Sequence, residues 1–140
     1  MGSRLPLGIR HPREDGTLLA SVELRDEAIS TAGDYERFFE KDGVIYHHIL
    51  DPATLWPAQN CQSVTVVARQ GVMADGLDTG IFVLGPERGM ELVERLPDVE
   101  ALIVDRNGKV WISSGLKGRV HMERRSLENS SEWSAPMPGR

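Results

Sequence analysis

The chain has 140 residues, of which 40% are hydrophobic and 26% charged, and its formal net charge at pH 7 is -5. This length supports one domain with a hydrophobic core, and the acidic balance argues against a nucleic-acid surface, which needs clustered Lys and Arg. The single cysteine, Cys61, excludes an intramolecular disulfide, and no apolar run is long enough to span a bilayer, so we expect a soluble chain.

The first part of the chain is predicted to consist of short strands joined by tight turns. Apolar residues alternate with other residues from 17 to 24, and Asp15 and Gly16 before them are typical of a hairpin turn. Asp42 and Gly43 form a second turn of this kind. The expected strands are residues 7–11, 17–24, 28–31, 35–40 and 44–50.

Residues 62–69 form the strongest predicted strand, and after it the hydrophobic period changes. The strand contains Ser-Val-Thr-Val-Val-Ala, which is apolar enough for the centre of a sheet. From residue 72 to residue 84 the apolar residues recur at helical spacing. Gly85 and Pro86 then fit the end of one helix and the start of the next. The expected apolar residues of the first helix are Val72, Met73, Leu77, Ile81 and Leu84, and those of the second are Met90, Val93 and Leu96.

Asn107 and Gly108 predict a last hairpin, between residues 100–105 and 109–113. Several hairpins with one helix pair predict an α+β domain, with the helices packed on one face of a mostly antiparallel sheet. Residues 1–118 are expected to form this domain. Residues 119–140 are polar with scattered proline, and we expect them to form a loosely ordered tail.

Residues 46–54 (Tyr-His-His-Ile-Leu-Asp-Pro-Ala-Thr) bring two imidazoles, a carboxylate and a hydroxyl to the end of a strand. Pro52 has no amide hydrogen and holds Asp51 extended, so the strand stops there. Polar groups at such a point are often presented to ligands. The alternative is that Asp51 and Thr54 only organise an Asx-type turn.

A second candidate site lies in the first predicted helix, where Asp75 and Thr79 are four residues apart and therefore on one face. A carboxylate and a hydroxyl suit Mg²⁺, which takes few protein oxygens together with waters and phosphates. The alternatives are that Asp75 complements the helix dipole and that Thr79 bonds back to its own turn. Gly76 and Gly80 beside the pair permit either close approach of a ligand or tight packing of the helix on the sheet.

Four segments together resemble the C-terminal half of the FAD:protein FMN transferases, the ApbE family. They are residues 31–37 (Thr-Ala-Gly-Asp-Tyr-Glu-Arg), 46–54, 63–68 and 73–89, and their order and spacing agree over about residues 5–115. The resemblance implies Mg²⁺-dependent transfer of FMN from FAD to a Ser or Thr hydroxyl of a target flavoprotein, with release of AMP. Family targets include subunits of membrane redox complexes, and family members are often exported to the bacterial periplasm or cell envelope.

The resemblance also implies a role for individual residues. Asp75 and Thr79 would hold the metal, and His48 would be the catalytic histidine. The remaining implied contacts are to FAD: Asp51 and Thr54 at the pyrophosphate, Thr31, Gly33 and Tyr35 around the flavin, and His48 beside them.

Two positions depart from the family pattern, since Ala32 and Leu55 stand where the family has Ser and Gly. Family members are also about twice as long as this chain. Two hypotheses are therefore open. The chain is either a flavin transferase that acts together with an N-terminal half or as a homo-oligomer, or a non-catalytic flavin-binding or structural module of the same fold.

Overall fold

The structure, a computed structural model, describes residues 4–14, 16–34, 39–41, 44–46 and 60–123. It contains two α-helices and antiparallel sheets, which confirms the predicted α+β class. The elements are β1 (Arg4–Arg10), β2 (Leu18–Arg25), β3 (Ala28–Gly33), β4 (Phe39–Lys41), β5 (Val44–Tyr46), β6 (Cys61–Ala68), α1 (Gly71–Leu84), α2 (Pro86–Arg95), β7 (Val99–Asp105), β8 (Val110–Ile112), the 3₁₀ turn η1 (Ser114–Leu116) and β9 (Val120–Met122).

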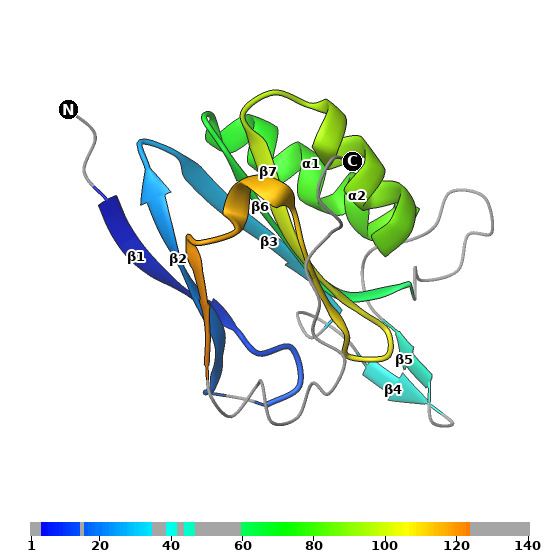
Figure 1. Ribbon diagram of the computed structural model, residues 1–140. Helices are drawn as coiled ribbons and strands as arrows, with labels where there is room; N and C mark the ends of the chain where they lie inside the picture. The colour runs from blue at the N-terminus through cyan, green and yellow to red at the C-terminus, as the bar shows by residue number, and fades with distance from the viewer. Residues whose placement is uncertain (1–3, 15, 35–38, 42–43, 47–59, 124–140) are drawn as a thin grey trace.

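The described elements form three layers (Figure 1). The middle layer is a four-stranded sheet of order β3-β6-β7-β8, and α1 and α2 cover one of its faces. A three-stranded sheet of order β1-β2-β9 covers the other face. The predicted hairpin after β3 is present as the pair β4-β5, and every strand pair is antiparallel.

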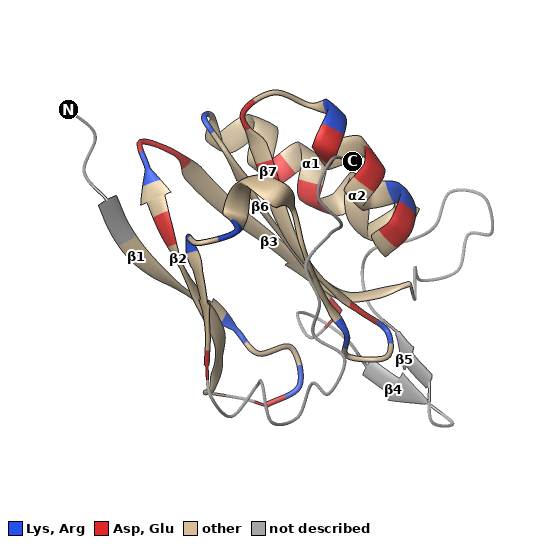
Figure 2. Cartoon of the chain, viewed as in Figure 1, with Lys and Arg blue, Asp and Glu red and all other residues tan. Residues whose placement is uncertain are grey.

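Strand β6 lies inside the four-stranded sheet and is buried on both faces, as its apolar sequence predicts. Val64 and Val66 pack against the helices, whereas Val67 packs against the three-stranded sheet. Charged residues lie largely on the helices and the connecting turns, and the middle sheet is almost free of them (Figure 2). Alternating side chains of one strand thus supply two separate cores.

The buried face of α1 agrees with the predicted one only in part, since Ile81 is buried and Leu77 packs against the core. Its buried residues are Ala74, Asp78, Ile81 and Phe82. Val72 and Met73 are 80% and 49% exposed. Val72 precedes Ala74 by two residues, and such positions point to nearly opposite sides of a helix, so only one of them can face the sheet.

Helix α2 buries Met90 and Val93, as predicted. Gly89 lets it approach α1 closely, because a Cβ atom at this position would lie 2.7 Å from Cγ2 of Ile81.

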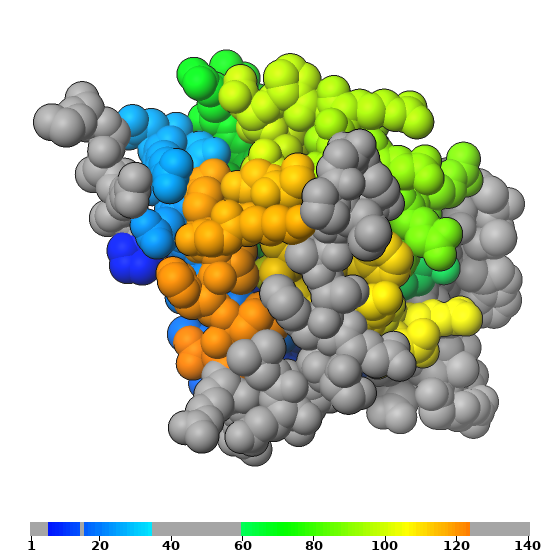
Figure 3. Space-filling view, in the orientation of Figure 1, coloured from blue at the N-terminus to red at the C-terminus, as the bar shows by residue number. Residues whose placement is uncertain are grey.

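Residues 119–123, expected to belong to a loose tail, are part of the domain. Strand β9 pairs with β2, with Val120 opposite Val22. Arg119 donates from Nε and Nη2 to the carbonyl oxygen of Glu23, at 3.1 and 2.7 Å, and pairs with the Glu27 carboxylate. In the space-filling view β9 lies on the surface beside β2 (Figure 3). The open edge of β2 supplies backbone partners that the polar composition does not reveal, and residues 124–140 lie outside the described residues.

None of the helices within the described ranges has the length and apolarity needed to cross a membrane.

Candidate functional site

The structure describes four of the eight predicted site residues. Thr31 and Gly33 lie in β3, and Asp75 and Thr79 lie on α1. The other four, Tyr35, His48, Asp51 and Thr54, lie outside the described residues.

Asp75 and Thr79 are both exposed on α1, one turn apart. A Cβ atom built on Gly76 or Gly80 would meet nothing within 4 Å among the described residues. These glycines therefore do not serve tight packing of α1 on the sheet. Among the described residues, nothing covers the outer face of the helix at these glycines, beside Asp75 and Thr79.

Asp78 is a buried carboxylate that joins α1 to β3. Its side chain lies on the inner side of the helix, and the residue is 2% exposed. Ser30 of β3 donates its hydroxyl to Oδ2 of Asp78 at 2.6 Å, and Thr79 donates its hydroxyl to Oδ1 at 3.1 Å. Ser30 Oγ also lies 3.4 Å from Oδ1 of Asp75.

Burial raises the pKa of Asp78 above its ordinary value, since the ionised form loses hydration, and the nearby Asp75 charge adds to this effect. The hydrogen bonds from Ser30 and Thr79 act in the opposite direction because they favour the charged form. The sequence interpretation assigned no role to Asp78. Its spacing from Ala74 and Ile81, four and three residues, was the available signal that it lies on the buried face.

Thr31 lies on the opposite face of the middle sheet from α1. Its neighbours in β3, Ser30 and Ala32, contact α1 and the helix-side core, so Thr31 points the other way. There its hydroxyl lies 3.0 Å from that of Thr65. The Thr31 hydroxyl and the Asp75–Thr79 pair are therefore separated by the sheet.

The end of β3 is fixed by an ion pair between the exposed Arg13 and the buried Asp34, which the sequence interpretation missed. Arg13 donates from Nη1 and Nη2 to the two carboxylate oxygens of Asp34, each at 2.7 Å. Asp34 is 7% exposed and follows Gly33 directly. This two-pronged contact holds the turn after β1 against the segment implied to line the flavin pocket.

Asp75 and Thr79 fit the donor set of Mg²⁺, which binds through few protein oxygens and completes its shell with waters and phosphate oxygens. Within the described ranges, no group of three or more His, Cys, Asp or Glu side chains is gathered closely enough to hold a metal ion.

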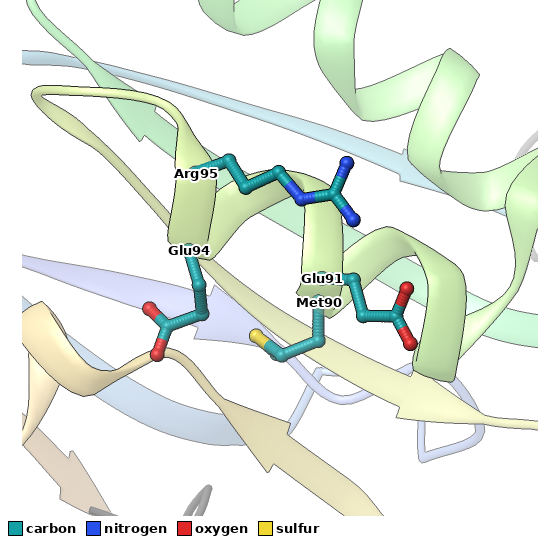
Figure 4. A pocket seen from close by; sticks show the side chains of 4 residues that line it. All are labelled: Met90, Glu91, Glu94 and Arg95. Carbon is teal, nitrogen blue, oxygen red and sulfur yellow. The ribbon is translucent and has the colours of Figure 1, made fainter. Parts of the chain in front are cut away.

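A hollow of about 290 Å³ lies elsewhere, beside α2, and is lined by Met90, Glu91, Glu94 and Arg95 (Figure 4). Glu94 accepts hydrogen bonds from the backbone nitrogen and the hydroxyl of Ser114 at one oxygen. None of the described site residues lines it.

Cys61 is buried at the start of β6, and burial together with the Asp105 and Asp34 charges raises the pKa of its thiol to about 12. A thiol of this kind is protonated at neutral pH and is a poor nucleophile. Cys61 belongs to the hydrophobic core on the helix side of the middle sheet.

The sequence model described as the ApbE family matches residues 2–103. The chain belongs to the ApbE family. Among curated members, the FAD:protein FMN transferase of Treponema pallidum is 43% identical over 118 residues, which cover 83% of this chain and 33% of that protein. The Vibrio cholerae protein of the same name is 44% identical over 99 residues, covering 69% of this chain and 30% of that protein.

Solved ApbE structures share the fold. The ApbE protein of Thermotoga maritima aligns with a TM-score of 0.75 at 37% identity, over 83% of this chain and 38% of that chain. The apo flavinyl transferase ApbE of Pseudomonas stutzeri aligns with a TM-score of 0.65 at 35% identity, over 84% of this chain and 37% of that chain. The chain thus spans about a third of the length of the ApbE relatives it matches, less than the half expected from the sequence.

Proposed function

We propose that this chain is the catalytic C-terminal part of a flavin transferase that moves FMN from FAD to a Ser or Thr hydroxyl of a target flavoprotein. The observation that carries the proposal is the outer face of α1, where Asp75 and Thr79 are exposed beside Gly76 and Gly80, at which an added Cβ atom would meet nothing within 4 Å among the described residues. Its family membership supports the same reaction class.

In this proposal, Asp75 and Thr79 hold Mg²⁺, which when bound neutralises negative charge on the pyrophosphate oxygens. The target hydroxyl attacks the FMN phosphorus, the new O–P bond forms, and the bond to AMP breaks so that AMP leaves. His48 accepts the hydroxyl proton, because an imidazole titrates in the range that suits a general base. Asp51 and Thr54 orient the pyrophosphate, and Thr31, Gly33 and Tyr35 contribute to the flavin pocket.

The partners proposed with this role are FAD, a target flavoprotein subunit of a membrane redox complex, and the longer N-terminal portion that relatives possess. Exposed apolar residues of α1, Val72 and Met73, support a further packing partner on this side of the domain. We propose the bacterial envelope as the place of action, following the family resemblance.

Intact-mass measurement of a target protein tests the proposal. A protein that a full-length relative flavinylates is incubated with FAD, Mg²⁺ and this chain, alone or mixed with the N-terminal portion of that relative. We expect one FMN-sized mass increase in the mixture that contains both parts, and its loss with Asp75→Ala. If no mixture gives the increase, the transferase proposal is wrong, and flavin binding by the chain alone then supports the non-catalytic module instead.

A further inference from the structure

Asp78 is a buried charged group for which the proposed reaction has no use. It is 2% exposed, although Asp75 and Thr79 on the same helix are exposed. A carboxylate in such a place needs hydrogen-bond donors to offset the loss of hydration. Two hydroxyls provide them, Ser30 Oγ at 2.6 Å and Thr79 Oγ1 at 3.1 Å.

The bond from Thr79 fixes the direction of its hydroxyl. A threonine hydroxyl has one hydrogen and two acceptor lone pairs. Thr79 donates this hydrogen to Oδ1 of Asp78 at 3.1 Å. A threonine within a helix often donates instead to the carbonyl oxygen four residues earlier, but among the described residues Thr79 donates to Asp78.

Once its hydrogen is directed to Asp78, the Thr79 oxygen has its lone pairs available on the remaining, exposed side. A metal ion binds an oxygen through such lone pairs and is repelled by a hydrogen directed at it. Asp78 thus selects the hydroxyl orientation in which Thr79 can act as a ligand.

Ser30 holds Asp78 in this position from a different element. Its single hydroxyl hydrogen can be given to one carboxylate at a time, and the 2.6 Å contact to Asp78 is far stronger than the 3.4 Å contact to Asp75. Asp78 is therefore fixed from β3, while Asp75 keeps its oxygens for an external partner.

We propose that Asp78 is a positioning residue for the cation site of Asp75 and Thr79, acting by taking the Thr79 hydroxyl hydrogen, and that Ser30 fixes Asp78 for this task. This inference rests on the proposed function, because it requires a cation at Asp75 and Thr79. Asp78 would act through Thr79 and would not itself bind the cation. Partners of metal ligands that lie outside the coordination shell commonly change metal affinity by about 10- to 100-fold.

The test is titration of the 140-residue chain with Mn²⁺ as a probe for Mg²⁺, with free Mn²⁺ measured by electron paramagnetic resonance. We expect Asp78→Asn to weaken Mn²⁺ binding by about 10- to 100-fold. Since Asp78 acts through Thr79, adding Asp78→Asn to a Thr79→Val chain should change affinity by no more than about twofold. Ser30→Ala, which removes no charge, should also weaken binding.

Two controls distinguish a positioning role of Asp78 from a general effect of removing negative charge and from misfolding of the variants. Glu91→Gln removes one exposed carboxylate from α2 and should leave Mn²⁺ affinity within about twofold of the unmodified chain. The melting temperature of each variant shows that the fold is intact, and Ser30→Ala keeps the inference testable if Asp78→Asn does not fold.

Each outcome decides between the inference and the metal assignment. Equal weakening by Asp78→Asn with and without the Thr79 hydroxyl would mean that Asp78 acts only through its charge, and the positioning role would be wrong. If Asp75→Ala weakens binding but Asp78→Asn and Ser30→Ala do not, the inference fails and the metal assignment stands. If the chain does not bind Mn²⁺, or binds it equally well with Asp75→Ala, both fail.

Discussion

Asp78 and Asp105 are two buried aspartates with different kinds of partner. Asp105, at the end of β7, accepts the backbone N–H groups of Asn107 and Lys109 at one oxygen, both at 2.9 Å. Its other oxygen accepts the indole N–H of Trp111 at 3.1 Å. Asp78, in α1, is held by the hydroxyls of Ser30 and Thr79.

The donors explain what each carboxylate can do. A backbone or indole N–H has no lone pair to offer, so the partners of Asp105 are fully used inside the protein and fix the turn at Gly108, whose φ is +87°. A hydroxyl that donates to Asp78 still has lone pairs, so it can bind a second group at the same time. Asp105 stabilises a hairpin, whereas Asp78, in our proposal, positions the Thr79 hydroxyl for a cation.

Replacing Asp105 should have the largest effect on stability, and it tests whether this carboxylate stabilises the hairpin. Asp105→Ala leaves three N–H donors without their acceptor, and we expect the free energy of unfolding to fall by about 3 kcal/mol, as measured by urea denaturation. Glu91→Ala, at an exposed position of α2, serves as the control. A loss no larger than that of the control would show that Asp105 does not hold the hairpin.

Ser30→Ala should have the next largest effect on stability. It removes the 2.6 Å donor of the buried Asp78, and we expect a loss of about 1.5 kcal/mol in the same urea experiment. Ser21→Ala, a half-exposed serine of β2, is the matched control. A Ser30→Ala chain as stable as this control would mean that Asp78 does not depend on β3.

Trp111→Phe removes one donor of Asp105 and keeps an aromatic ring for Lys109, whose ammonium lies 4.8 Å from the ring centroid. We expect a loss of about 1 kcal/mol in the free energy of unfolding. In a chain that already carries Asp105→Ala, the same change should cost less, because the acceptor is gone. If Trp111→Phe lowers the free energy of unfolding equally in both chains, the loss arises from packing of the ring and not from the hydrogen bond.

Ionisation of Cys61 is expected to have the smallest effect on stability at neutral pH. Cys61 is paired with Asp105 across β6 and β7. The raised pKa of about 12 means that the folded chain holds the thiol proton more tightly than the unfolded chain, whose value is near 9.0. The stability from this difference is complete below pH 9 and is lost as pH rises toward 12. Mass spectrometry should show little alkylation of the folded chain by iodoacetamide at pH 8 and full alkylation in urea, and equal rates would contradict the burial of Cys61.

Much of the fold followed from local patterns in the sequence. The two-sided burial of β6 was visible in its continuous apolar run, and Gly85 and Pro86 marked the boundary between the helices. Strand β9 was not predictable from its own residues, because it is stabilised by the edge of β2, far away in the sequence.

The candidate site was predictable only in part, for a similar reason. The spacing of Asp75 and Thr79 predicted that they share one face of a helix, and in the structure both are exposed on α1, one turn apart. The partners of Asp78 and Asp34 come from Ser30 and Arg13 on other elements. Contacts of this kind depend on how the elements pack, and local periodicity contains no information about them.

The pairing of β2 with β9 also determines how long one edge of β2 stays unpaired during synthesis of the chain. Strand β2 is made early, but its partner Val120 is made only after the middle sheet and both helices. Until then, one edge of β2 has unpaired backbone groups that can recruit a strand from another chain. We therefore expect nascent chains to be most prone to aggregation just before residue 120 emerges, and a chain cut before this point to keep that vulnerable edge permanently.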